Sequence, residues 1–198
     1  RRLFLKGCSG ITAFLVASPL WAAKEVAATK TLSQIELINV AVRERSLIER
    51  TGKLYAQFLA SARASDAKRL IADAISKFDQ LYILHQGSTL AGSGSSVSAS
   101  TLQARDRAWA KYRALLERPP VEKSLSDLVE AGDALSKLIN QTSGASAQFL
   151  SGSEIGQLVE RSGRQCLLSQ RIAKNYFFRA LKFNPEEASR QIAEARRE

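Results

Sequence analysis

The sequence has few of the side chains that metal centres and disulfide-rich domains require. Its 198 residues include one histidine, two cysteines and no methionine. A single histidine argues against a His-rich metal site, and Cys8 and Cys166 cannot build a disulfide framework. Because even an initiator methionine is absent, we expect the natural chain to begin before Arg1. We predict no metal site and no cofactor.

Proline, glycine and aromatic residues are also scarce. There are 4 prolines and 11 glycines, and aromatic residues make up 7% of the chain. This composition excludes a collagen-like protein, and the 45% hydrophobic content excludes a wholly disordered one. No stretch alternates between apolar and polar residues as a strand does, whereas helical spacing recurs along the chain. We therefore predict an all-α fold, an antiparallel bundle of long helices.

Residues 1–23 have the layout of an export signal. Arg1 and Arg2 are followed by Lys6 and by an apolar run over 11–21, about half of the ~20 residues that a membrane-spanning helix needs. The opening resembles the twin-arginine export signal. We expect a cleaved leader and a periplasmic protein. Its removal would lower the net charge from +10 to +7, and outside the inner membrane this charge favours a small anion or an acidic partner over nucleic acid.

Amphipathic helical patterns follow the leader. Ser65 is a suitable N-cap for the second of them, and Pro119 stops the third. The Gly/Ser-rich segment 87–100 is predicted to be a flexible linker. Asn184 and Pro185 predict the start of a last helix. The predicted helices before it cover about 31–62, 65–85, 102–118, 121–139 and 153–183.

Two segments of the chain resemble one another. Residues 37–74 and 158–195 align without a gap at an offset of 121 residues. Identical pairs include Arg43/Arg164, Leu47/Leu168, Arg50/Arg171, Lys53/Lys174 and Tyr55/Tyr176. Chance similarity between amphipathic helices does not easily place Arg, Leu, Lys and Tyr in one register. We predict two tandem related units, a first over 30–142 and a second over 153–198 that is incomplete.

The arginines of this repeat are the candidate ligand-binding residues. On a helix, Arg43 and Arg50 share one flank and Arg45 lies on the other, while Arg164 and Arg171 take the first flank in the second copy. An arginine held between helices is partly desolvated, and an anion that fits its planar fork relieves that cost. Nitrate or a carboxylate has this shape.

A plainer interpretation of the same arginines stays open. Flank arginines are commonly solvated or paired with carboxylates such as Glu36, Glu44 or Glu49, with little net stabilisation. We find no nucleophile–base pair and predict no catalytic residue and no enzyme activity. His85 continues an apolar stripe and is interpreted as a packing residue near a helix end.

The second copy carries a recognisable motif. Residues 162–176 resemble the run Ala-Gly-Arg-Gln-Arg-Met-Leu-Ser-Gln-Arg-Met-Ala-Lys of the PilJ-type domain, the N-terminal domain of type IV pili methyl-accepting chemotaxis transducers. Residues 38–45 are similar to the opening of that run. The resemblance implies an antiparallel helical bundle related to the periplasmic sensor domains of nitrate/nitrite sensor kinases.

In those sensors an arginine of the related helix binds nitrate at a dimer interface. By motif, that arginine corresponds to Arg45 in the first copy and to Cys166 in the second. The motif glycine corresponds to Val42 in the first copy and to Gly163 in the second. The two copies therefore do not supply a symmetrical pair. A site made from Arg45 of two chains, or from Arg43 and Arg164, remains open.

We predict an exported periplasmic sensory module that recognises a small anion such as nitrate or nitrite. It would act in chemotaxis-like or two-component signalling through a protein partner in the envelope, with a homodimer as one arrangement. The alternative is an envelope scaffold or adaptor that binds protein and no small molecule.

Overall fold

The computed structural model describes residues 32–91, 97–143 and 152–198, and these residues are helical with no strand. The predicted all-α fold is confirmed over these ranges. The leader predicted over 1–23 lies outside them. The described helices are α1 (Gln34–Leu59), α2 (Ala64–Ala91), α3 (Ala99–Glu117), the short 3₁₀ helix η1 (Glu122–Ser124), α4 (Leu125–Thr142), α6 (Glu154–Ala180) and α7 (Pro185–Arg197).

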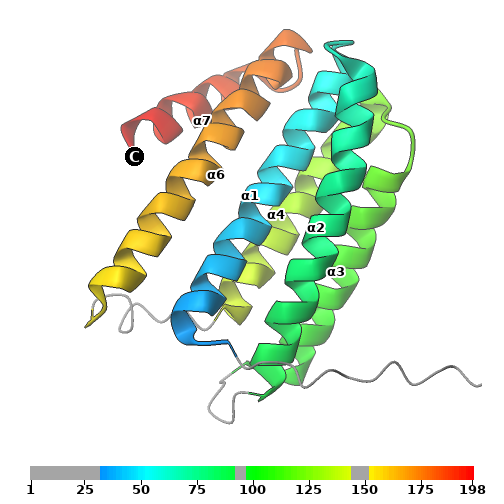
Figure 1. Ribbon diagram of the computed structural model, residues 1–198. Helices are drawn as coiled ribbons and strands as arrows, with labels where there is room; N and C mark the ends of the chain where they lie inside the picture. Colours follow the sequence, from blue (N-terminus) through cyan, green and yellow to red (C-terminus); the bar gives the residue numbers. More distant parts are fainter. Residues whose placement is uncertain (1–31, 92–96, 144–151) are drawn as a thin grey trace, which may run out of the picture.

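Helices α1 to α4 pack side by side, and the α6–α7 hairpin lies against α1 (Figure 1). Along the chain, successive helices reverse direction, so that α1 and α6 run the same way. Helix α1 packs against α2, α4 and α6, and its contact with α6 is its most extensive. It is therefore the central helix of the molecule.

Side-chain caps begin three of these helices. The Ser33 hydroxyl accepts a hydrogen bond from the backbone N–H of Glu36, and the Glu36 carboxylate accepts one from the backbone N–H of Ser33. This capping box starts α1, while Ser98 and Ser153 cap α3 and α6. Ser65, the predicted cap of α2, lies instead inside the first turn of that helix.

The turns after α1 and after α6 have the same backbone conformation. The first has positive φ at Ser61 (54°) and Arg63 (54°), and the second at Lys182 (57°) and Asn184 (42°). These positions are 121 residues apart, and the hydrogen bonds that close the two turns correspond at the same offset. Because Lys182 is left-handed, α6 ends at Ala180 rather than at the predicted 183.

Helix α2 is longer than predicted. It continues to Ala91, through the first residues of the segment 87–100 that composition predicted to be a linker. His85 and Ser88 extend its buried face, and the Ser88 hydroxyl accepts a hydrogen bond from the backbone N–H of Leu32 at 3.2 Å. Packing against the start of α1 thus overrides the weak helix propensity of Gly and Ser.

The hydrophobic core lies among α1 to α4 and extends to the α6–α7 hairpin through Phe178 and Ala188. Trp109 and Tyr112 are buried, and the Trp109 ring stacks on Phe78 with centroids 4.0 Å apart. The other large core side chains include Ile48, Leu54, Tyr55, Ile71, Ile75, Leu116, Leu125, Leu128, Leu135 and Ile139.

A glycine allows α1 and α6 to approach closely. A Cβ placed on Gly163 would lie 1.9 Å from Cγ1 and 2.9 Å from Cβ of Val42. Rotating the Val42 side chain cannot relieve the second contact, so the helices must separate if Gly163 gains a side chain. Val42 and Gly163 are themselves 121 residues apart, so corresponding positions face each other across this contact.

We expect Gly163→Val to lower the free energy of unfolding by about 1–3 kcal/mol through overpacking against Val42. The control is Gly152→Val, since a Cβ there meets no atom within 4 Å. Urea unfolding followed by circular dichroism at 222 nm measures both. Equal effects of the two substitutions would contradict the close approach, and Val42→Ala should partly restore the Gly163→Val protein.

Candidate functional site

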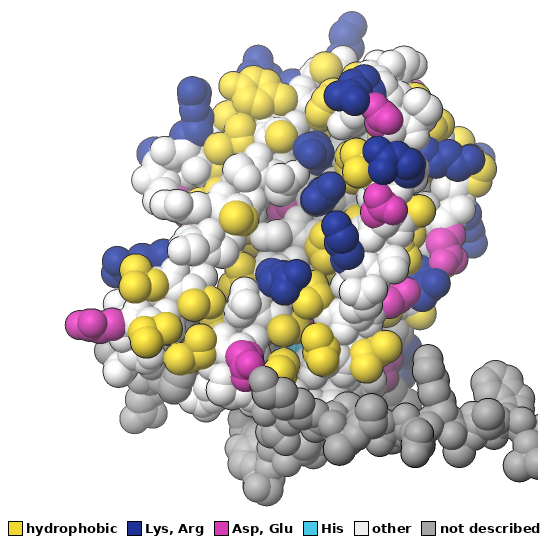
Figure 2. Space-filling view, viewed as in Figure 1, with side chains coloured by type: hydrophobic (Ala, Val, Ile, Leu, Met, Phe, Trp, Pro, Cys, Tyr) yellow, Lys and Arg dark blue, Asp and Glu magenta, His cyan; other side chains and the backbone are white. Residues whose placement is uncertain are grey.

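A groove runs along α1 between α2 and α6, and we call it the α1–α2–α6 groove. It encloses about 660 Å³. Figure 2 looks onto this face and shows Lys and Arg side chains along it. Its polar lining residues are Asn39, Arg43, Ser46, Arg50, Lys77, Ser162, Ser169 and Gln170, and its apolar ones are Val42, Leu47, Leu81, Leu158 and Val159.

The charge in this groove has one sign. Arg43 and Arg50 of α1 and Lys77 of α2 line it, and no Asp or Glu among the described residues does. Beside it, the pKa of Lys53 is lowered, first by burial and then by the positive charge of Arg50. Cations in a groove whose described lining includes no carboxylate make it attractive to anions.

Arg45 lies outside the groove, in the contact between α1 and α6. Its Nε is buried and meets no hydrogen-bond acceptor among the described residues. Burial lowers the pKa of the Arg45 guanidinium. The Glu160 carboxylate raises this pKa, while Arg164 and Arg171 lower it further. This environment is the partly desolvated one that an anion would relieve.

The two predicted arginines of α6 already have carboxylate partners. Arg164 Nη2 lies 2.5 Å from Oε2 of Glu198, and this hydrogen bond raises the pKa of Arg164. Arg171 Nε lies 2.9 Å from Oε1 of Glu49. The other oxygen of Glu49 lies 2.7 Å from Nζ of Lys174. The plainer interpretation, pairing with carboxylates, therefore describes Arg164 and Arg171 but not Arg45, and Glu49 is the acid involved on α1.

The five predicted arginines thus do not form one site. The structure brings Arg43 and Arg50 together in the groove, places Arg45 in the α1–α6 contact, and engages Arg164 and Arg171 in ion pairs. Cys166, which matches Arg45 in the repeat, is exposed, carries a free thiol and lines the groove. The two copies therefore present different chemistry at this position.

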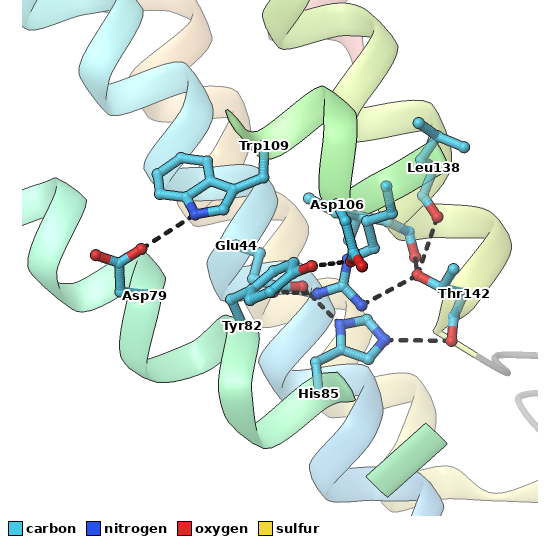
Figure 3. Close-up of polar contacts among 10 residues, drawn as sticks. Glu44, Asp79, Tyr82, His85, Asp106, Trp109, Leu138 and Thr142 are labelled. Carbon is cyan, nitrogen blue, oxygen red and sulfur yellow. Dashed lines mark hydrogen bonds and ion pairs between the residues drawn. The ribbon is translucent and has the colours of Figure 1, made fainter. Parts of the chain in front are cut away.

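Sequence reasoning missed a buried polar cluster inside the bundle (Figure 3). The Glu44 carboxylate, fully buried, accepts a hydrogen bond from Arg105 Nη2 at 2.6 Å and lies 2.7 Å from Nδ1 of His85. Nε2 of His85 lies 3.2 Å from the Thr142 carbonyl oxygen. Arg105 also lies over the Tyr82 ring, 4.8 Å from its centroid. Helices α1, α2, α3 and α4 are thereby joined at one level.

This cluster holds the bundle together and offers no access to a substrate. Glu44 and His85 are 0% exposed and Arg105 is 1% exposed. His85 is therefore more than a packing residue, and since α2 continues to Ala91 it lies well before the helix end. A signal was present in the sequence, because Glu44 falls between Val40 and Ile48 on the buried stripe of α1.

The described residues offer neither a metal cluster nor a helix suited to a membrane. Among them, no group of three or more His, Cys, Asp or Glu side chains could hold a metal ion. None of the described helices combines the length and the apolar character that crossing a membrane requires.

We expect Glu44→Gln to lower the free energy of unfolding by about 3 kcal/mol, because it leaves the buried Arg105 guanidinium without its counter-charge. Glu130→Gln, an exposed change on the same bundle, serves as the control and should change it by less than about 0.5 kcal/mol. Urea unfolding measures both variants. A loss at Glu44 no greater than at Glu130 would show that the cluster contributes little.

Comparison with known proteins assigns no family to this chain. No protein-family model matches it, and neither a curated protein nor a solved structure does.

Proposed function

We propose that this protein is an exported sensory module that binds a small planar anion, with nitrate and nitrite as the first candidates. The observation that most directly supports this proposal is the Arg45 guanidinium in the α1–α6 contact. Its buried Nε has no hydrogen-bond acceptor among the described residues. A planar oxyanion would accept two parallel hydrogen bonds from such a fork and offset its lost hydration.

The placement of Arg45 also connects binding to a mechanical response. Arg164 and Arg171 of α6 repel it, whereas Glu160 attracts it. An anion held by Arg45 would reduce this repulsion and favour a tighter approach of the two helices. A ligand that binds one helix arrangement better than another shifts the population between them.

Two repeated units fit this proposal. The turns after α1 and α6 share their positive-φ positions and their hydrogen bonds at the offset of 121 residues. This correspondence supports an α6–α7 hairpin that is a second copy of α1–α2. The α1–α6 contact would then be an internal counterpart of the interface between two PilJ-type sensor domains.

Location and signalling complete the proposal. The twin-arginine-like opening over 1–23 supports export to the periplasm, where nitrate is encountered first. A signalling protein in the envelope would receive the change in helix packing, and a homodimer would double the site. These roles rest on the resemblance to PilJ-type domains.

We expect nitrate or nitrite to give a saturable heat in isothermal titration calorimetry and chloride to give a weaker one, because chloride lacks the planar arrangement of oxygens. Arg45→Ala should weaken nitrate binding by about tenfold or more, since a charge-assisted hydrogen-bond pair is lost. Arg45→Lys, which keeps the charge but not the fork, should give an intermediate affinity.

Arg69→Ala is the matched control, because Arg69 is exposed on α2 and its ion pairs with described residues are to the neighbouring aspartates, at 3.5 Å and 4.0 Å. Its nitrate affinity should equal that of the unchanged protein. Circular dichroism confirms that each variant is folded. Absence of any nitrate- or nitrite-specific heat would refute anion sensing.

The alternative, an envelope adaptor, is favoured by one observation. Ile83 and Leu84 on α2 and Tyr176 on α6 are exposed at 61%, 45% and 50%. Exposed apolar side chains of this size are common at protein interfaces. An adaptor would show no heat with any of the three anions.

A further inference from the structure

We propose that the α1–α2–α6 groove is a second binding site, for an organic carboxylate with an apolar body of about six to ten carbon atoms. The proposal concerns the groove and not the α1–α6 contact, so it stands whether or not Arg45 binds nitrate. The groove and its lining are what support it.

The size of the groove selects an organic ligand over an inorganic ion. It encloses about 660 Å³. Sites for small organic molecules have volumes of about 300–1,000 Å³, whereas a four-atom oxyanion would leave most of that space to water. A ligand with an extended body fills it.

The cations of the groove define the charged part of the ligand. Arg43 and Arg50 are seven residues apart on one face of α1, two helical turns or about 10 Å along the axis. Lys77 lies on the opposite wall, on α2. With no Asp or Glu of the described chain lining the groove, a carboxylate anywhere along this line meets positive charge and no like charge.

Apolar side chains define the rest of the ligand. Leu158 and Val159, near the start of α6, line the groove together with Val42 and Leu81. Leu158 is 61% exposed, and Ile155 one turn earlier is 62% exposed. Hydrophobic side chains gather over this part of α6 in Figure 2. An apolar body lying here would remove these side chains from water.

Polar atoms in the groove wall lack partners. Ser46 Oγ and Gln170 Oε1 are buried and have no hydrogen-bond partner among the described residues. Both residues line the groove. Buried polar atoms without partners are uncommon, and a rotation of these side chains toward the groove would let them bond to a ligand or to the water that accompanies it.

The test is calorimetric titration of the 198-residue chain with octanoate, acetate and octan-1-ol. Octanoate should bind at least about tenfold more tightly than acetate, which lacks the apolar body, and than octan-1-ol, which lacks the charge. Equal affinities for octanoate and octan-1-ol would overturn the role of the cations. Equal affinities for octanoate and acetate would overturn the role of the apolar wall.

Two substitutions locate the site. Arg50→Gln and Leu158→Ser should each weaken octanoate binding by about fivefold or more. Their matched controls are Lys111→Gln, an exposed cation on α3, and Tyr176→Ser, an exposed side chain on α6 away from the groove lining. Both controls should bind octanoate as the unchanged protein does. Unaltered binding in Arg50→Gln and Leu158→Ser would refute the groove as the site.

Arg45→Ala separates this proposal from nitrate sensing. It should weaken nitrate binding by about tenfold or more and leave the octanoate affinity unchanged. If Arg45→Ala instead removes both heats from a protein that is folded by circular dichroism, a separate groove site is overturned. If octanoate binds and nitrate does not, the groove site holds and the proposed anion sensor fails.

Discussion

The close approach of α1 and α6 is the contact on which the candidate sites depend. It exists because Gly163 presents no side chain to Val42. The same approach encloses the Arg45 guanidinium between the two helices, and it brings the α6 side chains that form one wall of the groove beside α1. A wider separation would return Arg45 to water and open the groove, and both sites would lose the partial burial that makes an anion favourable.

The cations of α6 and those of the groove lie in different electrostatic environments. On α6, Arg164 and Arg171 are neutralised by Glu198 and Glu49, and Glu49 holds Lys174 as well. These pairs fasten α6 to α7 and to α1. On the groove face, the cations of α1 and α2 have no acidic neighbour in the groove lining. Arg164, Arg171 and Lys174 are therefore compensated, whereas the cations that line the groove are available to a ligand. Arg45 belongs to neither group, because it lies in the α1–α6 contact and its Nε has no acceptor among the described residues.

The buried cluster around Glu44 has a different role. A carboxylate taken out of water is costly unless cations and hydrogen-bond donors surround it, and here Arg105 and His85 do so from two other helices. These hydrogen bonds form only when α1, α2 and α3 keep one position relative to each other along the bundle axis. The aromatic stack of Phe78 on Trp109 lies in the same bundle and fixes α2 against α3. The central helix α1 thus has two different polar faces. Glu44 is buried on the face toward the bundle, whereas Arg43 and Arg50 line the groove on the other.

The sequence by itself determined the all-helical class, the approximate helix bounds and the cluster of arginines, because apolar spacing, capping residues and prolines act locally. It could not choose between Glu44 and Glu49 as the carboxylate that pairs with an arginine of the repeat. It placed Arg43 and Arg45 on different flanks of one helix, but what each flank faces is known only once the neighbouring helices are placed. The extension of α2 through Gly and Ser likewise came from packing against the start of α1. Which arginine is paired, which lies between helices and which faces a groove was decided by tertiary structure alone, since each outcome depends on a partner distant along the chain. Arg164 and Glu198 are 34 residues apart, and Arg171 and Glu49 are 122 residues apart.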